Sequence, residues 1–294
     1  MLTKLLEEIN ERNWNTKSIV VVSGEEIIAE HYNVPKSDLL PQYSISKAFT
    51  ATAIGLLCDE GKLNLQDLVS DYIPEVKNSD NTKLKNVKIK HLLMNASGCA
   101  EGYLFEADRH NHNTDDYLSY IIQQPLQYEA GEIFVYSNSN YYLLSRIAEN
   151  ITGTPLDEFI IERIFKPFGI TEYMVTRCPM NHTLGGSGLF LMTTDMIKLG
   201  ILYSNLGTYK GIRIISEDYV NKAISIQIKL NSKEGYGFGF MMKDTRCVYV
   251  AGNFNQLLLI DKFKHMIVGI NSDVRPSLAG TLMKLVRRTI IKDN

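Results

Sequence analysis

The two ends of the chain carry the pattern that most limits its fold. Residues 2–12 place apolar side chains at helical spacing, and SIVVVSGEEIIAEHY (18–32) then predicts two strands joined at Ser23 and Gly24. Near the other end, CVYVAG, QLLLID and HMIVGIN predict three strands within 247–271, and residues 278–292 return to helical spacing. We therefore expect one antiparallel sheet built from both termini and flanked by the N- and C-terminal helices.

The middle of the chain has a different pattern. Helical periodicity recurs at 44–60, 139–151, 155–166 and 194–205, and polar loops separate these segments. The sequence thus predicts an α/β fold in which a large, mostly helical insert interrupts the sheet. The expected boundaries place 1–38 and 225–294 in a sheet lobe and 39–224 in a helical lobe, with a cleft between them.

Composition excludes several classes of function. The 294 residues are 45% hydrophobic and 22% charged, with a net charge of -2, so no basic field exists to attract nucleic acid or a membrane surface. The four cysteines are scattered and form no C-x-x-C pair, which argues against a zinc or redox motif. The N-terminus lacks the pattern of a signal peptide, and no apolar run approaches the roughly 18 residues of a spanning helix. We expect a cytoplasmic protein.

Ser44 and Lys47 form the only S-x-x-K in the chain, at the start of the apolar run AFTATAIGLL. Residues three apart share one face of a helix, and the first turn collects free N–H groups and the positive end of the helix dipole. An adjacent amine can hold a proton relay and lower the cost of deprotonating a serine hydroxyl. The alternative is that Ser44 is only a helix cap. A lysine beside so much apolar sequence is costly unless it is paired or functional, which favours chemistry.

Tyr136 and Asn138 supply a second polar pair. They lie two residues apart in FVYSNSN, so an extended segment points both side chains the same way. A neighbouring ammonium lowers the pKa of a tyrosine, which suggests that Tyr136 acts as a phenolate beside Lys47. Similar Y-x-N triplets begin at Tyr203 and Tyr219, but both lie in or beside helical patterns, where the two side chains diverge.

Several segments, taken in order, resemble the serine β-lactamase and penicillin-binding protein superfamily, in its class C and esterase branch. The resemblance spans nearly the whole chain. It rests on YSISKAFTATAIGLL, on VKIKHLLMNASG with Asn95 where histidine is usual, and on AGEIFVYSN, GGSGLFLMTTDMIKLGILYSNLG and GYGFGF. It implies a β-lactamase/transpeptidase-like fold. It also implies that Ser44 is the acylated nucleophile, Lys47 its proton partner and Tyr136 the general base, with Asn138 as a companion group that contacts Lys47 and a substrate carbonyl.

The third motif of that superfamily, K-T-G or H-x-G, is matched least well. YVAGNFN aligns Gly252 with the glycine, and Val250 then replaces the cation that grips a substrate carboxylate. The resemblance implies that the backbone N–H of Asn253 is the second oxyanion donor beside that of Ser44. Because the cation is absent, we rank esters and amides above β-lactams as substrates.

RHNHN (109–113) offers His110 and His112 near Asp108, Asp115 and Asp116. A metal site is one interpretation, but no third ligand follows at fixed spacing, so a solvated polar loop is favoured. The resemblance to the superfamily implies that this region belongs to the cleft rim, where a substrate lid is the further alternative. We therefore expect no metal and no cofactor.

The predicted function is a serine hydrolase that acts through an acyl-enzyme on a small-molecule or peptide substrate. The rivals are a non-catalytic or penicillin-sensing binding protein on the same fold, motivated by Asn95 and Val250, and a purely structural interaction protein.

Overall fold

The computed structural model describes residues 1–107, 109 and 114–292. An eight-stranded sheet joins the two ends of the chain in the order β2-β1-β13-β12-β11-β10-β9-β8, and every pair in it is antiparallel. Its strands are β1 (Thr16–Ser23), β2 (Glu26–Tyr32), β8 (Ile228–Lys229), β9 (Gly235–Tyr236), β10 (Met241–Met242), β11 (Cys247–Gly252), β12 (Gln256–Asp261) and β13 (Met266–Ser272). The α/β class and the antiparallel sheet built from both termini are confirmed.

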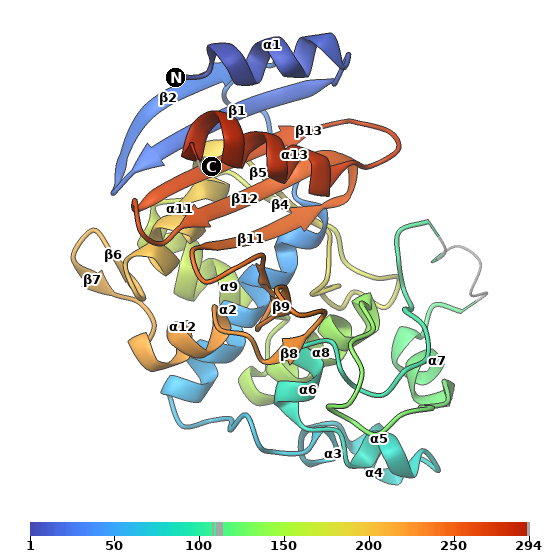
Figure 1. Cartoon of the computed structure of the whole chain (residues 1–294). Helices are drawn as coiled ribbons and strands as arrows, with labels where there is room; N and C mark the ends of the chain where they lie inside the picture. The colour runs from blue at the N-terminus through green and yellow to red at the C-terminus, as the bar shows by residue number, and fades with distance from the viewer. Residues whose placement is uncertain (108, 110–113, 293–294) are drawn as a thin grey trace.

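Helices cover both faces of this sheet (Figure 1). The terminal helices α1 (Thr3–Glu11) and α13 (Ala279–Val286) lie on one face, and α11 (Thr193–Ser204) packs on the other. Residues of β1 alternate between the two cores: Ile19 and Val21 belong to the cluster under the terminal helices, and Val20 and Val22 to the larger cluster on the opposite side. Burial on both faces explains why the strand reads as an unbroken apolar run.

The inserted segment is mostly helical. Its centre is α2 (Ser46–Asp59), which is buried at every position from Ser46 to Leu57 and packs against α8. Its other helices are α3 (Val69–Tyr72), α4 (Pro74–Asn78), α5 (Thr82–Lys85), α6 (Ile89–Leu93), α7 (Tyr117–Gln123), α8 (Asn138–Thr152), α9 (Leu156–Ile160), α10 (Lys166–Phe168) and α12 (Glu217–Ala223). Two small sheets complete it, from β3 (Leu40–Pro41), β5 (Leu189–Leu191) and β4 (Met174–Val175), and from β6 (Thr208–Tyr209) and β7 (Ile212–Arg213).

The structure adds details that periodicity does not show. Strands β8, β9 and β10 have two residues each, too short for an alternating pattern to appear. The segment predicted as one helix over 155–166 is α9, a π-helical turn (Ile161–Phe165) and α10. The lobe boundaries at 38/39 and 224/225 stay a prediction.

No helix among the described residues is long and apolar enough to cross a membrane. Asp108, His110 and His112, which the sequence raised as metal ligands or lid residues, lie outside the described residues.

Candidate active site

Ser44 lies in a 3-10 turn, Tyr43–Ile45, directly before α2. Tyr43 has a left-handed backbone conformation, φ 45°, which turns the chain sharply ahead of the serine and stores strain of the kind found at functional sites. The Tyr43 ring packs edge-on against Phe254, with 5.0 Å between centroids, and so ties this turn to the one that follows β11. Ser44 itself is only partly buried, so its hydroxyl remains accessible.

Lys47, the second residue of α2, is fully buried, with 0% of its surface exposed. Its Nζ lies 3.1 Å from Oγ of Ser44, 2.5 Å from Oδ1 of Asn138 and 2.9 Å from the carbonyl oxygen of Gly186. The amine therefore has three polar neighbours, and two of them can only accept a hydrogen bond.

Burial lowers the pKa of Lys47 to about 7, because a charged amine loses its water there. Glu106 acts in the opposite direction and Arg109 adds to the lowering. These two residues form an ion pair with each other at 3.7 Å. A large share of Lys47 is thus neutral at neutral pH, which is the state that can accept a proton.

Tyr136 lies beside the same amine, whose Nζ is 4.7 Å from the centre of the tyrosine ring. Burial raises the pKa of Tyr136 to about 12, and a hydrogen bond with Ser44 acts against that rise. The direction is opposite to the one that the sequence suggested for a tyrosine next to an ammonium. Burial of the phenol disfavours the charged phenolate, so Tyr136 rests as a phenol.

Asn138 is the first residue of α8 and is 4% exposed. Its Oδ1 accepts from Lys47, and its Nδ2 donates to the carbonyl oxygen of Leu104 at 2.9 Å. The expected contact with Lys47 is present. Since the second end of the amide is held by Leu104, the contact with a substrate carbonyl stays a prediction.

Val250, Gly252 and Asn253 lie in one pocket with Ser44 and Tyr136. We call it the front pocket; its volume is about 340 Å³, within the range of small-molecule sites. Gly252 is required for its shape, because a Cβ there would lie 2.8 Å from the carbonyl oxygen of Gln42, just before the serine turn. The missing side chain lets β11 approach that turn closely, and the backbone of Asn253 follows at once.

Some residues of the site were not foreseen from single motifs. The carbonyl of Gly186 holds Lys47, and a Cβ on Gly186 would lie 2.9 Å from Oδ1 of Asn138, so the GGSG segment is a place of close packing. Asn95 is buried, and its Oδ1 accepts from the backbone N–H of Ser137 and from Nδ2 of Asn140. Asn95 thus holds the segment that follows Tyr136 and has a structural role in its own right.

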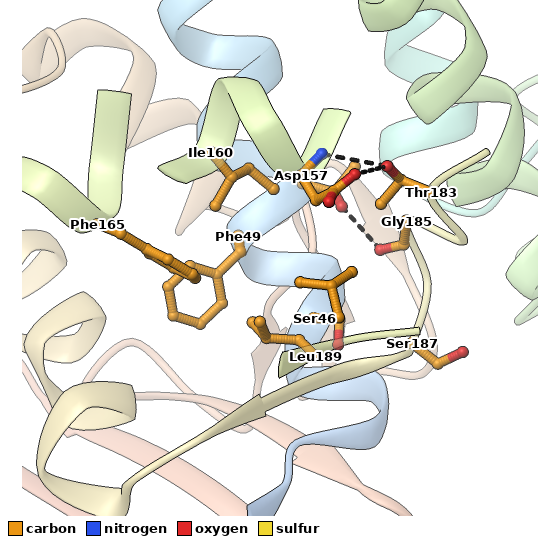
Figure 2. Close-up of a pocket in the computed structure, with 11 residues that line it drawn as sticks. Ser46, Phe49, Asp157, Ile160, Phe165, Thr183, Gly185, Ser187 and Leu189 are labelled. Carbon is orange, nitrogen blue, oxygen red and sulfur yellow. Dashed lines mark hydrogen bonds between the residues drawn. The ribbon is translucent and has the colours of Figure 1, made fainter. Parts of the chain in front are cut away.

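Figure 2 shows a second cavity, lined by Ser46 and Phe49 of α2 among others, which we call the rear cavity. It offers about 20 Å³, the space of about one water molecule. Ser46 lines it, and its Oγ has no hydrogen-bond partner among the described residues. The nearby carboxylate of Asp157 accepts from Thr183 and pairs with Arg177 at 2.9 Å.

Within the described ranges, no group of three or more His, Cys, Asp or Glu residues could hold a metal ion. Fold and pocket together define an α/β protein of the β-lactamase and transpeptidase class, with a serine, a buried lysine and a tyrosine gathered at one site.

Comparison with known proteins agrees with that class. The Beta-lactamase family model matches residues 4–279, and the chain belongs to this family of hydrolases. Protein flp of Staphylococcus aureus strain MW2 is 34% identical over 268 residues, which cover 80% of this chain and 53% of that protein. The chain therefore spans about half the length of this relative.

Solved structures share the whole fold. A putative β-lactamase from Bacteroides dorei DSM 17855 superimposes with a TM-score of 0.84 at 18% identity, covering 100% of this chain and 99% of the other. The octameric penicillin-binding protein homologue from Pyrococcus abyssi gives a TM-score of 0.82 at 20% identity, covering 99% and 76%. The predicted β-lactamase/transpeptidase-like fold is thereby confirmed.

Proposed function

We propose that this chain is a serine hydrolase that forms an acyl-enzyme on Ser44, with esters and amides preferred over β-lactams. The observation that carries the proposal is the set of partners around Lys47. The carbonyl oxygens of Asn138 and Gly186 accept hydrogen bonds from the two N–H groups of a neutral Lys47 amine. Its lone pair is then left for the Ser44 hydroxyl, whose oxygen is 3.1 Å away.

The reaction then follows from the two pKa values. Neutral Lys47 takes the Ser44 proton while Oγ bonds to the substrate carbonyl carbon, and the oxyanion forms near the backbone N–H groups of Ser44 and Asn253. The Tyr136 phenol gives its proton to the leaving group as the bond to that group breaks. Lys47 returns a proton to Tyr136, which restores the neutral pair. Water then releases the acyl group by the same steps in reverse.

Preference for esters and amides is supported by Val250, which stands in the pocket where a cation would bind a carboxylate. Recognition of a β-lactam carboxylate would leave that charge without a partner at this position. A cytoplasmic location stays a prediction that cell fractionation tests.

The test is active-site labelling. The protein is treated with a fluorophosphonate probe, and the modified peptide is mapped by mass spectrometry. We expect one adduct on Ser44 that disappears in Ser44→Ala. Ser46→Ala is the matched control, because this serine lies two residues away but lines the rear cavity, and it should label like the parent. Absence of any serine adduct would reject the proposal in favour of a binding protein. A penicillin adduct that forms but is not turned over would favour the sensing alternative.

A further inference from the structure

The front pocket has a lining without charge. Among the described residues that form it, none is Asp, Glu, Lys, Arg or His. Lys47 is not part of this lining but contacts Ser44 and Tyr136, and burial lowers its pKa to about 7. A substrate that carried a carboxylate into this space would leave water and meet no opposite charge, which is costly.

One wall of the pocket is aromatic. Phe134 lies 5.1 Å from Tyr236 and 6.3 Å from Tyr136 between ring centroids. The hydroxyl of Tyr236 is turned to that of Tyr141, 3.4 Å away, so its hydrogen-bonding end is engaged within the helical segment. Met241 extends the same lining with a flexible apolar side chain. Such a wall favours contact with a ring or a bulky apolar group.

The facing side of the pocket is open and small. It is formed by the end of β11 and the start of α13, where Ala251, Ala279 and Gly280 contribute. Gly280 is exposed at the pocket rim, a Cβ built on it would meet nothing within 4 Å, and the pocket itself has a volume of about 340 Å³. The pocket therefore has room for a large group against the aromatic wall.

Two described arginines near the site, Arg275 and Arg109, have anionic partners. Arg275 stacks on Phe254, with its guanidinium carbon 4.2 Å from the ring centre, and its Nε donates to Asp273 at 2.8 Å. Arg109 pairs with Glu106. These pairs supply little net attraction for an anionic substrate.

We propose that the front pocket accepts a neutral ester or amide that carries an aromatic or bulky apolar group, with Val250 excluding carboxylates and Gly280 setting the size limit. This inference rests on the proposed serine hydrolase function. It names the substrate class for which the site is built.

A matched pair of esters tests whether the front pocket excludes a substrate that carries a carboxylate. p-Nitrophenyl valerate and p-nitrophenyl hydrogen succinate have acyl chains of similar length, but only the second carries a carboxylate. We expect kcat/KM to be at least about tenfold higher for valerate. Val250→Lys should reduce this ratio by about tenfold, whereas Val250→Met, of similar length but uncharged, should not. Equal or greater activity on the succinate ester in the parent protein would overturn the inference.

A second pair of esters, one bulky and one small, tests whether Gly280 limits the size of the substrate. Gly280→Leu fills the open space and should lower kcat/KM for p-nitrophenyl phenylacetate about tenfold while changing that for p-nitrophenyl acetate less than about threefold. Thr281→Leu is the control, since this exposed neighbour on α13 is not part of the lining, and both esters should react as in the parent. Equal losses on the two esters in Gly280→Leu would contradict the size limit.

Fluorophosphonate labelling distinguishes a failure of the proposed substrate class from a failure of the proposed hydrolase function. Labelling at Ser44 together with a preference for the succinate ester would overturn the substrate class and leave the hydrolase intact. Failure to label Ser44 and to hydrolyse any of the four esters would overturn both.

Discussion

Ser44 and Ser46 differ by two positions in the chain, yet their surroundings differ in every property that matters for reactivity. Ser44 is partly exposed in a pocket of about 340 Å³ and has an amine 3.1 Å away. Ser46 is 5% exposed beside a cavity of about 20 Å³, and its hydroxyl has no partner among the described residues. The comparison shows that a position at the start of a helix is not enough to make a serine a nucleophile. Access for a carbonyl and a proton acceptor within reach are both needed.

Removal of the Lys47 amine should lower catalytic activity more than the substitutions that follow. Lys47→Met should lower kcat/KM by about 10³–10⁴-fold, near the upper range for a general base. Lys47→Arg should be as inactive, because a guanidinium stays protonated and cannot accept the serine proton. Ester hydrolysis measures both, with the exposed Lys77→Met as control and circular dichroism to verify folding. Activity of Lys47→Arg within about tenfold of the parent would show that charge, not basicity, is what the site uses.

Loss of the phenol should have the next largest effect. Tyr136→Phe keeps the ring beside Lys47 but removes the proton donor for the leaving group, so kcat should fall by about 10²–10³-fold. The loss should be smaller for esters with acidic leaving groups, such as p-nitrophenol, than for alkyl esters, since a good leaving group needs less help from an acid. Tyr173→Phe is the control, because this ring packs on Phe165, which lines the rear cavity. An equal loss on both ester types would indicate a positioning role.

The pKa of about 7 for Lys47 predicts the pH dependence of the front pocket. Because the neutral amine is the active form, kcat/KM for an uncharged ester should rise up to about tenfold per pH unit below pH 7 and level off above it. Rate profiles between pH 5 and 9 measure this. A profile that is flat through pH 7 would contradict the assignment of Lys47 as the base.

The same group links stability to pH. In the unfolded chain Lys47 keeps its proton up to about pH 10.4, whereas the folded protein releases it near pH 7, so the unfolded state binds more protons between those values. The free energy of unfolding should therefore rise with pH in that window, by at most ~1.4 kcal/mol per unit from this residue. The contribution is lost as the pH falls through 7. Urea unfolding of the parent and of Lys47→Met at pH 7 and 9 isolates it. The same pH dependence in both proteins would exclude Lys47 as its source.

The rear cavity should give the smallest effect. Ser46→Ala removes a buried hydroxyl that bonds to no described residue, so the protein should be unchanged or more stable by up to ~1 kcal/mol. Urea unfolding measures the stability, and ester hydrolysis should stay within about threefold of the parent. If Ser46→Ala destabilises the protein by more than that amount, an ordered water in the rear cavity holds the hydroxyl.

Much of the fold could be predicted because its long elements repeat one pattern. The apolar runs at both ends gave five strands of the sheet, and α2, α8 and α11 follow the predicted segments to within about two residues. The strands β8 to β10 could not be found in this way, since pairing of β10 with β11, of β9 with β10 and of β8 with β9, rather than a local pattern, defines them. The protonation of Tyr136 also needed the structure, because burial of the phenol itself raises its pKa.

By itself, the sequence determined which side chains are available to form the site. The spacing of Ser44 and Lys47 places them on one helix face, and Tyr136 and Asn138 stand two apart where α8 begins. Only the tertiary structure decided that the amine is removed from water, that the oxygens of Gly186 and Asn138 accept its hydrogen bonds, and that the described lining of the pocket carries no charged residue. The reason is that burial and electrostatics depend on neighbours brought from roughly 90 to 200 residues away, and no local pattern encodes them.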